Sequence, residues 1–482
     1  DAAVSSQPPC AESYAASASG TESRPGSSST GLSSRTAAAS VSCARSRRVA
    51  VTGLGIVSPI GTDIPTAWTN LVEGRSGLRE ITYWDPALTE CHASGEVRDF
   101  DATRWMDFKA VRRTDKNVVY GVAAAKQALA DSGLDAKIRA RILRGSEDSL
   151  VNFVLFGTSF TAAPRGDVGT RIHDFALAVQ RPGNNERLIF LASLLRKLGH
   201  TTPSDIGQYV TASVARVQAE MARYDQGLAS NNPDLRSQAY RARGLSADTS
   251  IRPCYALDAT WRALDLGTPE RLAVIGPGLD FADKNEGLDY YPLQTIQPFA
   301  AMETIRSLKS VTAFDINPQC LGHLRRARQS SRYRIELTLD RARRWSPELR
   351  KWWRSFGTIL GREVAALPVP SGLSLDTRAV EFPRSILRRL QIRDLNIVTD
   401  RFGVFDVILA TNILVYYDAN EQSLAMTNIA GMLPAGGLFL TNDYIAPSAG
   451  LKLLTTQDVI YSDVRDDEDR IYVYVKSAFA GR

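Results

Sequence analysis

The C-terminal part of the chain, residues 266–482, is predicted to be an α/β domain built on a largely parallel β-sheet. From residue 271 onward, short apolar runs alternate with stretches of helical periodicity, which is the pattern of βαβ units. The last two apolar runs flank an Asp-rich turn at 463–469. The sheet is therefore expected to end in an antiparallel hairpin.

The individual elements of this domain follow from apolar runs bounded by Gly, Pro, Asn and Asp. Strands are predicted at residues 271–275, 310–316, 405–411 and 437–442, and helices at 292–308, 318–328 and 420–433. The closing hairpin is predicted from strands at 459–462 and 470–475.

A glycine motif follows the first predicted strand directly. Gly276 and Gly278 come at its carboxyl end, and Asp280 follows them. Because glycine has no Cβ, such a loop lets a ligand lie against the backbone there. Many tight turns also contain Gly-x-Gly, so the motif alone does not decide between a cofactor loop and an ordinary turn.

An acidic residue stands at the end of the second predicted strand, where Asp315 is followed by Ile316. A carboxylate at this position can accept hydrogen bonds from both ribose hydroxyls of a nucleoside. The alternative is that Asp315 caps the helix beginning at Pro318, a role for which Asn317 is equally suited.

Two further segments place polar groups beside predicted strands. Asp394 could accept a hydrogen bond from the exocyclic amine of adenine while Leu395 offers its backbone amide; the alternative is an Asp/Asn turn before a strand. The strand at 405–411 delivers Thr411 and Asn412 at its carboxyl end, followed by paired tyrosines. Ligands of open α/β sheets bind outside the carboxyl ends of the strands.

In their order along residues 271–477, these motifs resemble the class I S-adenosylmethionine (SAM)-dependent methyltransferases. Residues 408–418 are also similar to the corresponding stretch of chemotaxis-receptor glutamate methyltransferases. The resemblance implies a Rossmann-like sheet and SAM as the cofactor. It implies cofactor binding by Gly276, Gly278, Asp280, Asp315, Ile316, Asp394, Leu395, Thr411 and Asn412.

The sequence departs from that family at three places. The first loop reads Gly-Pro-Gly-Leu-Asp, an insertion occupies 281–297, and residues 329–390 are longer than the family pattern. No catalytic residue is assigned, because methyl transfer depends mainly on alignment of the reactants. Cys320 and His323 follow Asp315 on a predicted helix, where core packing is the expected role. The methyl acceptor is expected to be a small molecule or a protein.

Residues 47–135 resemble the start of a β-ketoacyl-acyl-carrier-protein synthase of the thiolase fold, through an Arg-Arg-Val-Ala-Val-Thr-Gly-Leu-Gly opening and an Ala-rich helix ending at Gly133. We therefore expect a partial α/β fragment of that fold at 46–140. Condensation needs an activated cysteine and two histidines. The candidates that remain, none in such a motif, are Cys254, His173, His200 and His323. No condensing activity is expected, and an inactive fusion or scaffold protein is the third alternative.

The remaining segments have simpler predictions. Residues 1–45, rich in Ser and Ala, are expected to be a disordered leader, with an organellar transit peptide as the alternative. In the fragment a strand is predicted at 48–52 and helices at 65–73 and 115–133. A helical region is predicted at 150–265, with helices at 186–198, 203–226 and 257–264.

Composition limits the class of protein. The longest apolar run is too short for a membrane helix, so a soluble protein is expected. The five cysteines are scattered, which predicts neither a disulfide scaffold nor a metal site and favours a cytoplasmic location, with an organelle as the alternative. The 58 basic and 52 acidic side chains permit an acidic partner without requiring one. Arginines and tryptophans cluster at 325–393, but amphipathic helices explain them better than nucleic-acid binding does.

Overall fold

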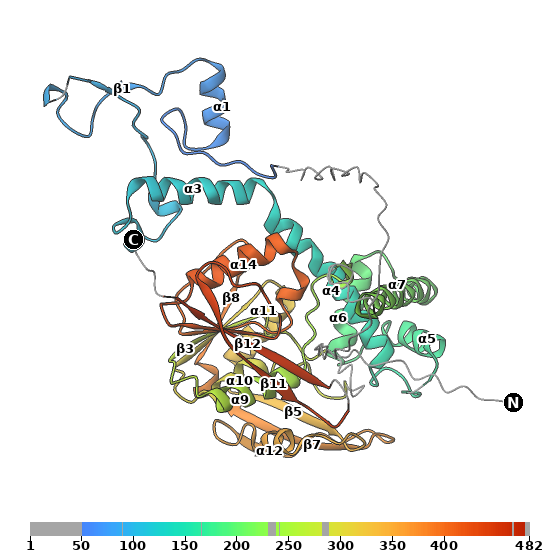
Figure 1. The fold of residues 1–482 in the computed structure, drawn as a ribbon. Helices are drawn as coiled ribbons and strands as arrows, with labels where there is room; N and C mark the ends of the chain where they lie inside the picture. Colours follow the sequence, from blue (N-terminus) through green and yellow to red (C-terminus); the bar gives the residue numbers. More distant parts are fainter. Residues whose placement is uncertain are drawn as a thin grey trace, which may run out of the picture. The chain divides into compact units, whose positions relative to one another are not determined.

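A computed structural model of the chain describes residues 51–88, 90–164, 166–229, 238–240, 242–281, 289–464 and 467–477. These residues divide into two compact units, one ending at Leu134 and one beginning at Asp135 (Figure 1). We call them the N-terminal unit and the C-terminal unit. The predicted leader, residues 1–45, lies outside the described residues, and so do residues 48–50 of the first predicted strand.

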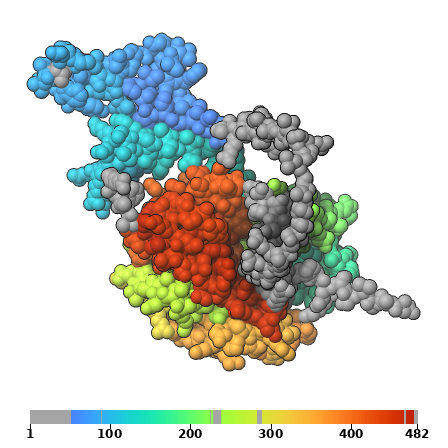
Figure 2. All heavy atoms as spheres, in the orientation of Figure 1, coloured from blue at the N-terminus to red at the C-terminus, as the bar shows by residue number. Residues whose placement is uncertain are grey.

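The N-terminal unit, coloured blue in Figures 1 and 2, has two main helices. Helix α1 (Ile64–Val72) begins after Asp63, whose carboxylate accepts a hydrogen bond from the Thr66 amide at 2.9 Å. Helix α3 (Lys116–Asp131) is the longer one. Both predicted helices are confirmed. The short elements are β1 (Arg79–Glu80), η1 (Pro86–Leu88), β2 (Ala93–Ser94), η2 (Ala102–Arg104) and α2 (Phe108–Val111), and β1 pairs antiparallel with β2.

The strand predicted at 48–52 is wrong in its described part. Residues 51 and 52 belong to no strand, and Val51 is 78% exposed. The chain that follows lies along α3, where the Leu54 amide donates a hydrogen bond to Asp131 at 2.9 Å. A strand persists only with a partner to complete its hydrogen bonds. Among the described residues of this unit, the pair β1–β2 is the only one.

The C-terminal unit is built around a seven-stranded sheet in the order β11-β12-β10-β9-β3-β4-β8 (Figure 1). The strands are β3 (Arg271–Ile275), β4 (Ser310–Asp315), β8 (Leu390–Asp394), β9 (Val407–Leu409), β10 (Leu438–Thr441), β11 (Leu451–Ile460) and β12 (Glu468–Lys476). The five strands from β8 to β10 are parallel, whereas β12 is antiparallel to both of its neighbours. The predicted Rossmann-like sheet with a terminal antiparallel hairpin is confirmed.

The order of the strands makes this a doubly wound sheet. From the central strand β3 the chain moves to β4 and β8 on one side and then returns to β9 and β10 on the other. Right-handed crossovers in opposite directions place the connecting helices on opposite faces of a sheet. Both faces are then covered, which agrees with the near-complete burial of β3 from Leu272 to Ile275.

The helices of this sheet begin at residues suited to helix starts. They are α9 (Arg252–Leu264), α10 (Gln297–Thr304), α11 (Pro318–Gln329) and α14 (Ala419–Gly431). Asp418 and Glu421 form a capping box at α14, and the Asn317 side chain accepts from the Gln319 amide at α11. The cap of α11 is therefore Asn317 rather than Asp315.

The long segment between α11 and β8 forms a second, antiparallel sheet in the order β5-β7-β6. Its elements are β5 (Arg332–Asp340), α12 (Pro347–Ser355), β6 (Arg362–Val364), β7 (Leu375–Pro383) and α13 (Arg384–Leu387). Trp345, Trp352 and Trp353 are buried in the core shared with the main sheet. Their rings are not exposed for stacking on bases, so the core-packing explanation of this cluster is confirmed.

The predicted helical region packs over the loop that follows β3. Its helices are α4 (Leu134–Phe156), α5 (Val168–Ala178), α6 (Glu186–Lys197) and α7 (Pro203–Ala229). Their shared core includes Phe153 and Phe175 together with Phe281 and Leu293 from the insertion after the glycine motif. The predicted boundaries of the helical region (150–265) and the sheet domain (266–482) fall inside one compact unit and stay predictions. Within the described residues no helix is long and apolar enough to cross a bilayer.

Candidate functional site

A cleft opens at the carboxyl ends of strands β3, β4 and β9 and beside the loop after β8. Seven of the nine residues predicted to bind cofactor line it: Gly276, Gly278, Asp315, Ile316, Leu395, Thr411 and Asn412. The sheet order reverses at β3, whose neighbours are β4 on one side and β9 on the other. Such a reversal leaves a crevice between loops that turn to opposite faces, and ligands of doubly wound sheets bind there.

The glycine loop forms one wall of the cleft. Gly276 and Gly278 have φ values of 63° and 66°, a backbone region that suits glycine. A Cβ on Gly276 would lie 2.1 Å from Cδ1 of Ile413, and one on Gly278 would lie 2.8 Å from the carbonyl oxygen of Ala247. Both glycines are therefore required by close contacts within the chain as well as by the turn.

The segment at 245–249 lines the cleft beside the glycine loop, and no sequence motif marks it. The Leu279 amide donates to the Ala247 carbonyl at 2.7 Å, and the Thr249 amide donates to the Leu279 carbonyl at 3.0 Å. Residues 245–249 thus lie along the glycine loop like a short extra strand. Its side of the cleft includes Asp248, whose carboxylate accepts from Ser149 at 3.0 Å. A short polar link between two helices carries no sequence signal for this position.

Asp315 lies on the floor of the cleft at the last position of β4. The Asn317 amide donates to its carboxylate at 2.8 Å, and the Cys320 thiol also hydrogen bonds to it. Burial raises the pKa of the Asp315 carboxyl from 3.8 to about 6, against the opposing effect of these hydrogen bonds. The group is mostly ionised at neutral pH and becomes protonated in mild acid.

Two predicted ligands beside Asp315 already have partners within the chain. Asp394 pairs with Asp315 in the sheet register, but its carboxylate holds Arg139 of α4 at 2.8 Å. The Leu395 side chain lines the cleft, whereas its backbone amide donates to the Asp315 carbonyl at 3.1 Å. An adenine ring that used these two groups would have to replace both bonds. Their role in cofactor binding stays a prediction.

Thr411 and Asn412 bring polar groups to the centre of the site. Asn412 has φ 56°, a left-handed conformation that Asn adopts more readily than most residues. The backbone amide of Asn412 donates to Oδ1 of Asn442 at 2.8 Å. In return, Nδ2 of Asn442 donates to Oδ1 of Asn412 at 2.8 Å. Nε2 of Gln297 donates to the Thr411 hydroxyl at 2.7 Å. Asn442 ends the predicted strand at 437–442, but its partner is 30 residues away in sequence.

Asp280 does not line the cleft, contrary to the prediction. It is 6% exposed, and its carboxylate accepts hydrogen bonds from the Tyr291 hydroxyl and from Nε2 of Gln294, both at 2.9 Å. The insertion at 281–297 supplies both donors, so the chain folds back on Asp280 and takes the carboxylate away from the loop. Arg187 of α6 donates to the Asp280 carbonyl at 3.2 Å and links the helical region to this turn.

Cys320 and His323 are parts of the core, as predicted. Burial raises the pKa of the Cys320 thiol well above its usual value, and burial lowers the pKa of His323 to about 4. The His323 ring bonds through Nε2 to the Tyr333 hydroxyl at 2.8 Å, and that hydroxyl accepts from the Thr295 amide. Neither group lines the cleft, so neither is placed as a general base.

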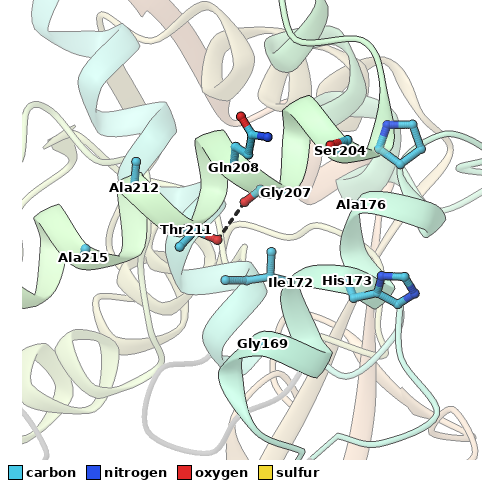
Figure 3. Close-up of a pocket in the computed structure, with 11 residues that line it drawn as sticks. Gly169, Ile172, His173, Ala176, Ser204, Gly207, Gln208, Thr211, Ala212 and Ala215 are labelled. Atoms are coloured by element: carbon cyan, nitrogen blue, oxygen red, sulfur yellow. Dashed lines mark hydrogen bonds between the residues drawn. The ribbon is translucent and has the colours of Figure 1, made fainter.

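A second hollow lies between α5 and α7 of the helical region (Figure 3). Small side chains such as Gly169, Ala176, Gly207 and Ala212 make up much of its wall. Of the described residues that line it, His173 is the one with an ionisable side chain. None of the residues predicted to bind cofactor lines it.

Comparisons with known proteins find similarity in the N-terminal part of the chain. Residues 46–160 match the family model of the β-ketoacyl synthase N-terminal domain. The chain is 44% identical over 89 residues to 3-oxoacyl-[acyl-carrier-protein] synthase 2 of Vibrio harveyi, which covers 18% of this chain and 21% of that protein. The same enzyme of Coxiella burnetii is 43% identical over 89 residues, with 18% and 22% covered. The chain thus spans about a fifth of the length of these relatives.

Solved structures similar to the chain include three methyltransferases. N-methyltransferase NodS from Bradyrhizobium japonicum, in complex with S-adenosylhomocysteine (SAH), has 12% identity and a TM-score of 0.27 over 48% of this chain and 90% of its own. TrmN from Thermus thermophilus is 16% identical with a TM-score of 0.25, and the similarity covers 46% of this chain and 52% of TrmN. Magnesium protoporphyrin IX methyltransferase from Synechocystis, with bound SAM, is 10% identical with a TM-score of 0.25. This similarity covers 47% of this chain and 78% of that enzyme. All three similarities are weak.

Proposed function

We propose that the C-terminal unit binds SAM and transfers its methyl group to a small-molecule or protein acceptor. The observation that carries the proposal is the convergence of Gly276, Asp315 and Asn412 on one cleft, at the point where the strand order reverses. These residues come from three different strand ends. Together they offer a glycine backbone, a carboxylate and an amide side chain. These polar groups suit a bound nucleoside better than an apolar core.

The chemistry of the cleft fits such a cofactor in part. The Asp315 carboxylate can accept hydrogen bonds from ribose hydroxyls, and Ile316 and Leu395 offer apolar surface to a flat base. At the edge of the base the fit is incomplete, because the Leu395 amide and Asp394 have the partners described above. The Asp315 carboxylate can therefore serve the nucleoside's sugar, but recognition of its base requires an exchange of bonds.

The role of the protein in the reaction is alignment. The bound cofactor would supply an electrophilic methyl group on a sulfonium, so a strong base is not required. Tyr416 and Tyr417 line the cleft, and burial raises the pKa of both phenols well above its usual value, which keeps them protonated at neutral pH. We assign them to the wall of the site, and the reacting groups would be brought together by binding.

Calorimetry of the full chain with SAM and SAH tests the proposal. We expect binding of both, an at least tenfold loss of affinity in Asp315→Asn, and unchanged affinity in the control Asp225→Asn, an exposed carboxylate on α7. Absence of heat at millimolar ligand in the unsubstituted chain would overturn the proposal and favour an inactive fusion or scaffold protein.

The similarity of residues 46–160 to ketoacyl synthases raises a second candidate function, condensation of acyl chains. We propose that this activity is lacking. A condensing cysteine must form a thiolate. Burial raises the pKa of both Cys254 and Cys320 above the usual range, and the exposed Cys91 lies in no motif of a condensing cysteine. Incubation with labelled acyl-carrier substrate should leave every cysteine unlabelled; an acylated cysteine would restore the condensing function.

A further inference from the structure

Arg139, in the second turn of α4, reaches the loops at the edge of the cleft. Its guanidinium donates to both carboxylate oxygens of Asp394, at 2.8 and 3.3 Å. It also donates to both oxygens of Asp135, at 2.9 and 3.1 Å, and lies 3.5 Å from the Ile316 carbonyl. One arginine thus connects the helical region to the ends of two neighbouring strands, next to Ile316 and Leu395 of the cleft wall.

The next arginine of α4 makes a different kind of contact. Arg141 donates to both oxygens of Glu421 at 3.0 and 3.2 Å and to the Tyr416 carbonyl, and its own carbonyl accepts from the Leu245 amide at 3.1 Å. The side chains of Arg141 and Glu421 are 22% and 12% exposed. Those of Arg139 and Asp394 are 32% and 48% exposed. The contact at Arg141 is therefore better protected from water than the contact at Arg139.

We propose that Arg139 is a latch on the cofactor cleft: it occupies Asp394 in the free protein and gives it up when adenine binds. This inference rests on the proposed function, because the competing group is the 6-amino group of the cofactor. Asp394 is the neighbour of Asp315 in the sheet register, so a nucleoside held by Asp315 brings its base to this rim.

The exchange leaves no charge without a partner. When Asp394 turns to the ligand, Arg139 keeps both bonds to Asp135 in its own helix. Asp135 is itself held by Nδ2 of Asn396 at 2.9 Å. A partly exposed ion pair contributes little to stability, so its replacement is inexpensive. Arg141 remains bound to Glu421, and the rim opens at Arg139 while α4 stays attached at Arg141.

The test compares SAH affinity in the full chain and in three variants. Arg139→Gln removes the competitor and should tighten SAH binding by about two- to fivefold, the range that an exposed ion pair allows. Asp394→Ala removes the acceptor that both competitors use and should weaken binding. Arg196→Gln is the control, because Arg196 is an exposed arginine of α6 that donates to the Ala192 carbonyl of its own helix at 3.1 Å and does not line the cleft, and it should leave affinity unchanged.

A second readout is hydrogen exchange of the amides at 135–142 in the full chain. SAH should increase exchange there while it protects the amides near Gly276 and Asp315, and Arg139→Gln should show the faster exchange without ligand. Equal or weaker SAH binding in Arg139→Gln, or protection of 135–142 by SAH, would overturn the latch although SAM binding itself stands. If no variant binds SAH, the proposed function fails first and the latch with it.

Discussion

Trp68, Leu78 and Leu88 of the N-terminal unit are 65%, 66% and 77% exposed, whereas side chains as large as Phe153 and Phe299 of the C-terminal unit are fully buried. Among the described residues of the N-terminal unit, the buried apolar side chains are Ala67, Ile81, Val119 and Ala123. The C-terminal unit instead has two extensive cores, one against the sheets and one within the helical region. The two units come from one chain but bury their apolar side chains very differently.

The difference shows that sequence similarity and structural self-sufficiency are separate properties. The N-terminal unit carries the most specific similarity in the chain, yet it represents about a fifth of the relatives it matches. Its large apolar side chains Trp68, Leu78 and Leu88 are nevertheless exposed. The match also runs to residue 160, past the start of the C-terminal unit, so α4 belongs to the matched segment and to the rim of the cleft.

The largest expected effect is on hydrogen exchange. Amides in α1 of the N-terminal unit should exchange at least about a thousandfold faster than those of β3 and β4, because few buried contacts oppose local opening. Exchange of the full chain followed by mass spectrometry measures this ratio. Comparable protection in both units would contradict the comparison.

Core substitutions should separate the units next. Phe153→Ala should lower the free energy of unfolding of the C-terminal unit by about 3–5 kcal/mol, because it leaves a cavity among buried rings. Trp68→Ala removes a larger side chain from the N-terminal unit. Because the ring is exposed, this substitution should change the free energy of unfolding of the N-terminal unit by less than about 0.5 kcal/mol. Denaturant titration checks both, and a large cost for Trp68→Ala would mean that its ring has a partner.

Ligand binding should belong to the C-terminal unit alone, and it should depend on pH through Asp315. Its pKa of about 6 means that the ribose-binding carboxylate is lost in mild acid, so SAH affinity should fall about tenfold for each pH unit below 6. Asp315→Asn should abolish this dependence. Asp131→Asn, which alters a carboxylate of the N-terminal unit bonded to Leu54, should leave the pH profile as it is.

The same shift predicts the sign of a stability effect. The folded-state pKa of Asp315 lies above the unfolded value of 3.8, so the folded chain holds a proton that the unfolded chain loses between about pH 4 and 6. The free energy of unfolding should therefore fall as pH rises through that window. Asp315→Asn should remove that contribution and stabilise the unit at neutral pH by roughly 1–3 kcal/mol, and a loss of stability there would contradict the assignment.

The smallest expected effect concerns the exposed surface. Leu88→Ser should leave the free energy of unfolding unchanged within about 0.5 kcal/mol, because Leu88 is exposed. It should reduce self-association if exposed apolar side chains cause it. Sedimentation velocity at several concentrations measures self-association. A lower free energy of unfolding in Leu88→Ser would contradict the exposed position of this side chain.

Local patterns predicted the main sheet well. The strand at 271–275 matches β3 residue for residue, and the acid after the second strand reaches the cleft as expected. The second sheet was missed although its first strand alternates polar and apolar residues from Arg332 to Asp340, a period typical of strands. The arginines of that alternation were attributed to helices instead.

Long-range partners could not be predicted from spacing. Asp394 appeared free for a ligand because Arg139 precedes it by 255 residues. Asp280 was predicted to contact the cofactor because no sequence pattern in the insertion indicates that Tyr291 and Gln294 donate hydrogen bonds to its carboxylate. A motif identifies which groups a loop carries, whereas the rest of the fold decides which of them remain available.

Photolabelling with methyl-labelled SAM reports where the cofactor lies as well as whether it binds. Irradiation of the full chain followed by peptide mapping should place the label in the segments around Gly276, Asp315 and Asn412, and excess SAH should suppress it. Label in the hollow between α5 and α7, or label that SAH does not suppress, would contradict the account.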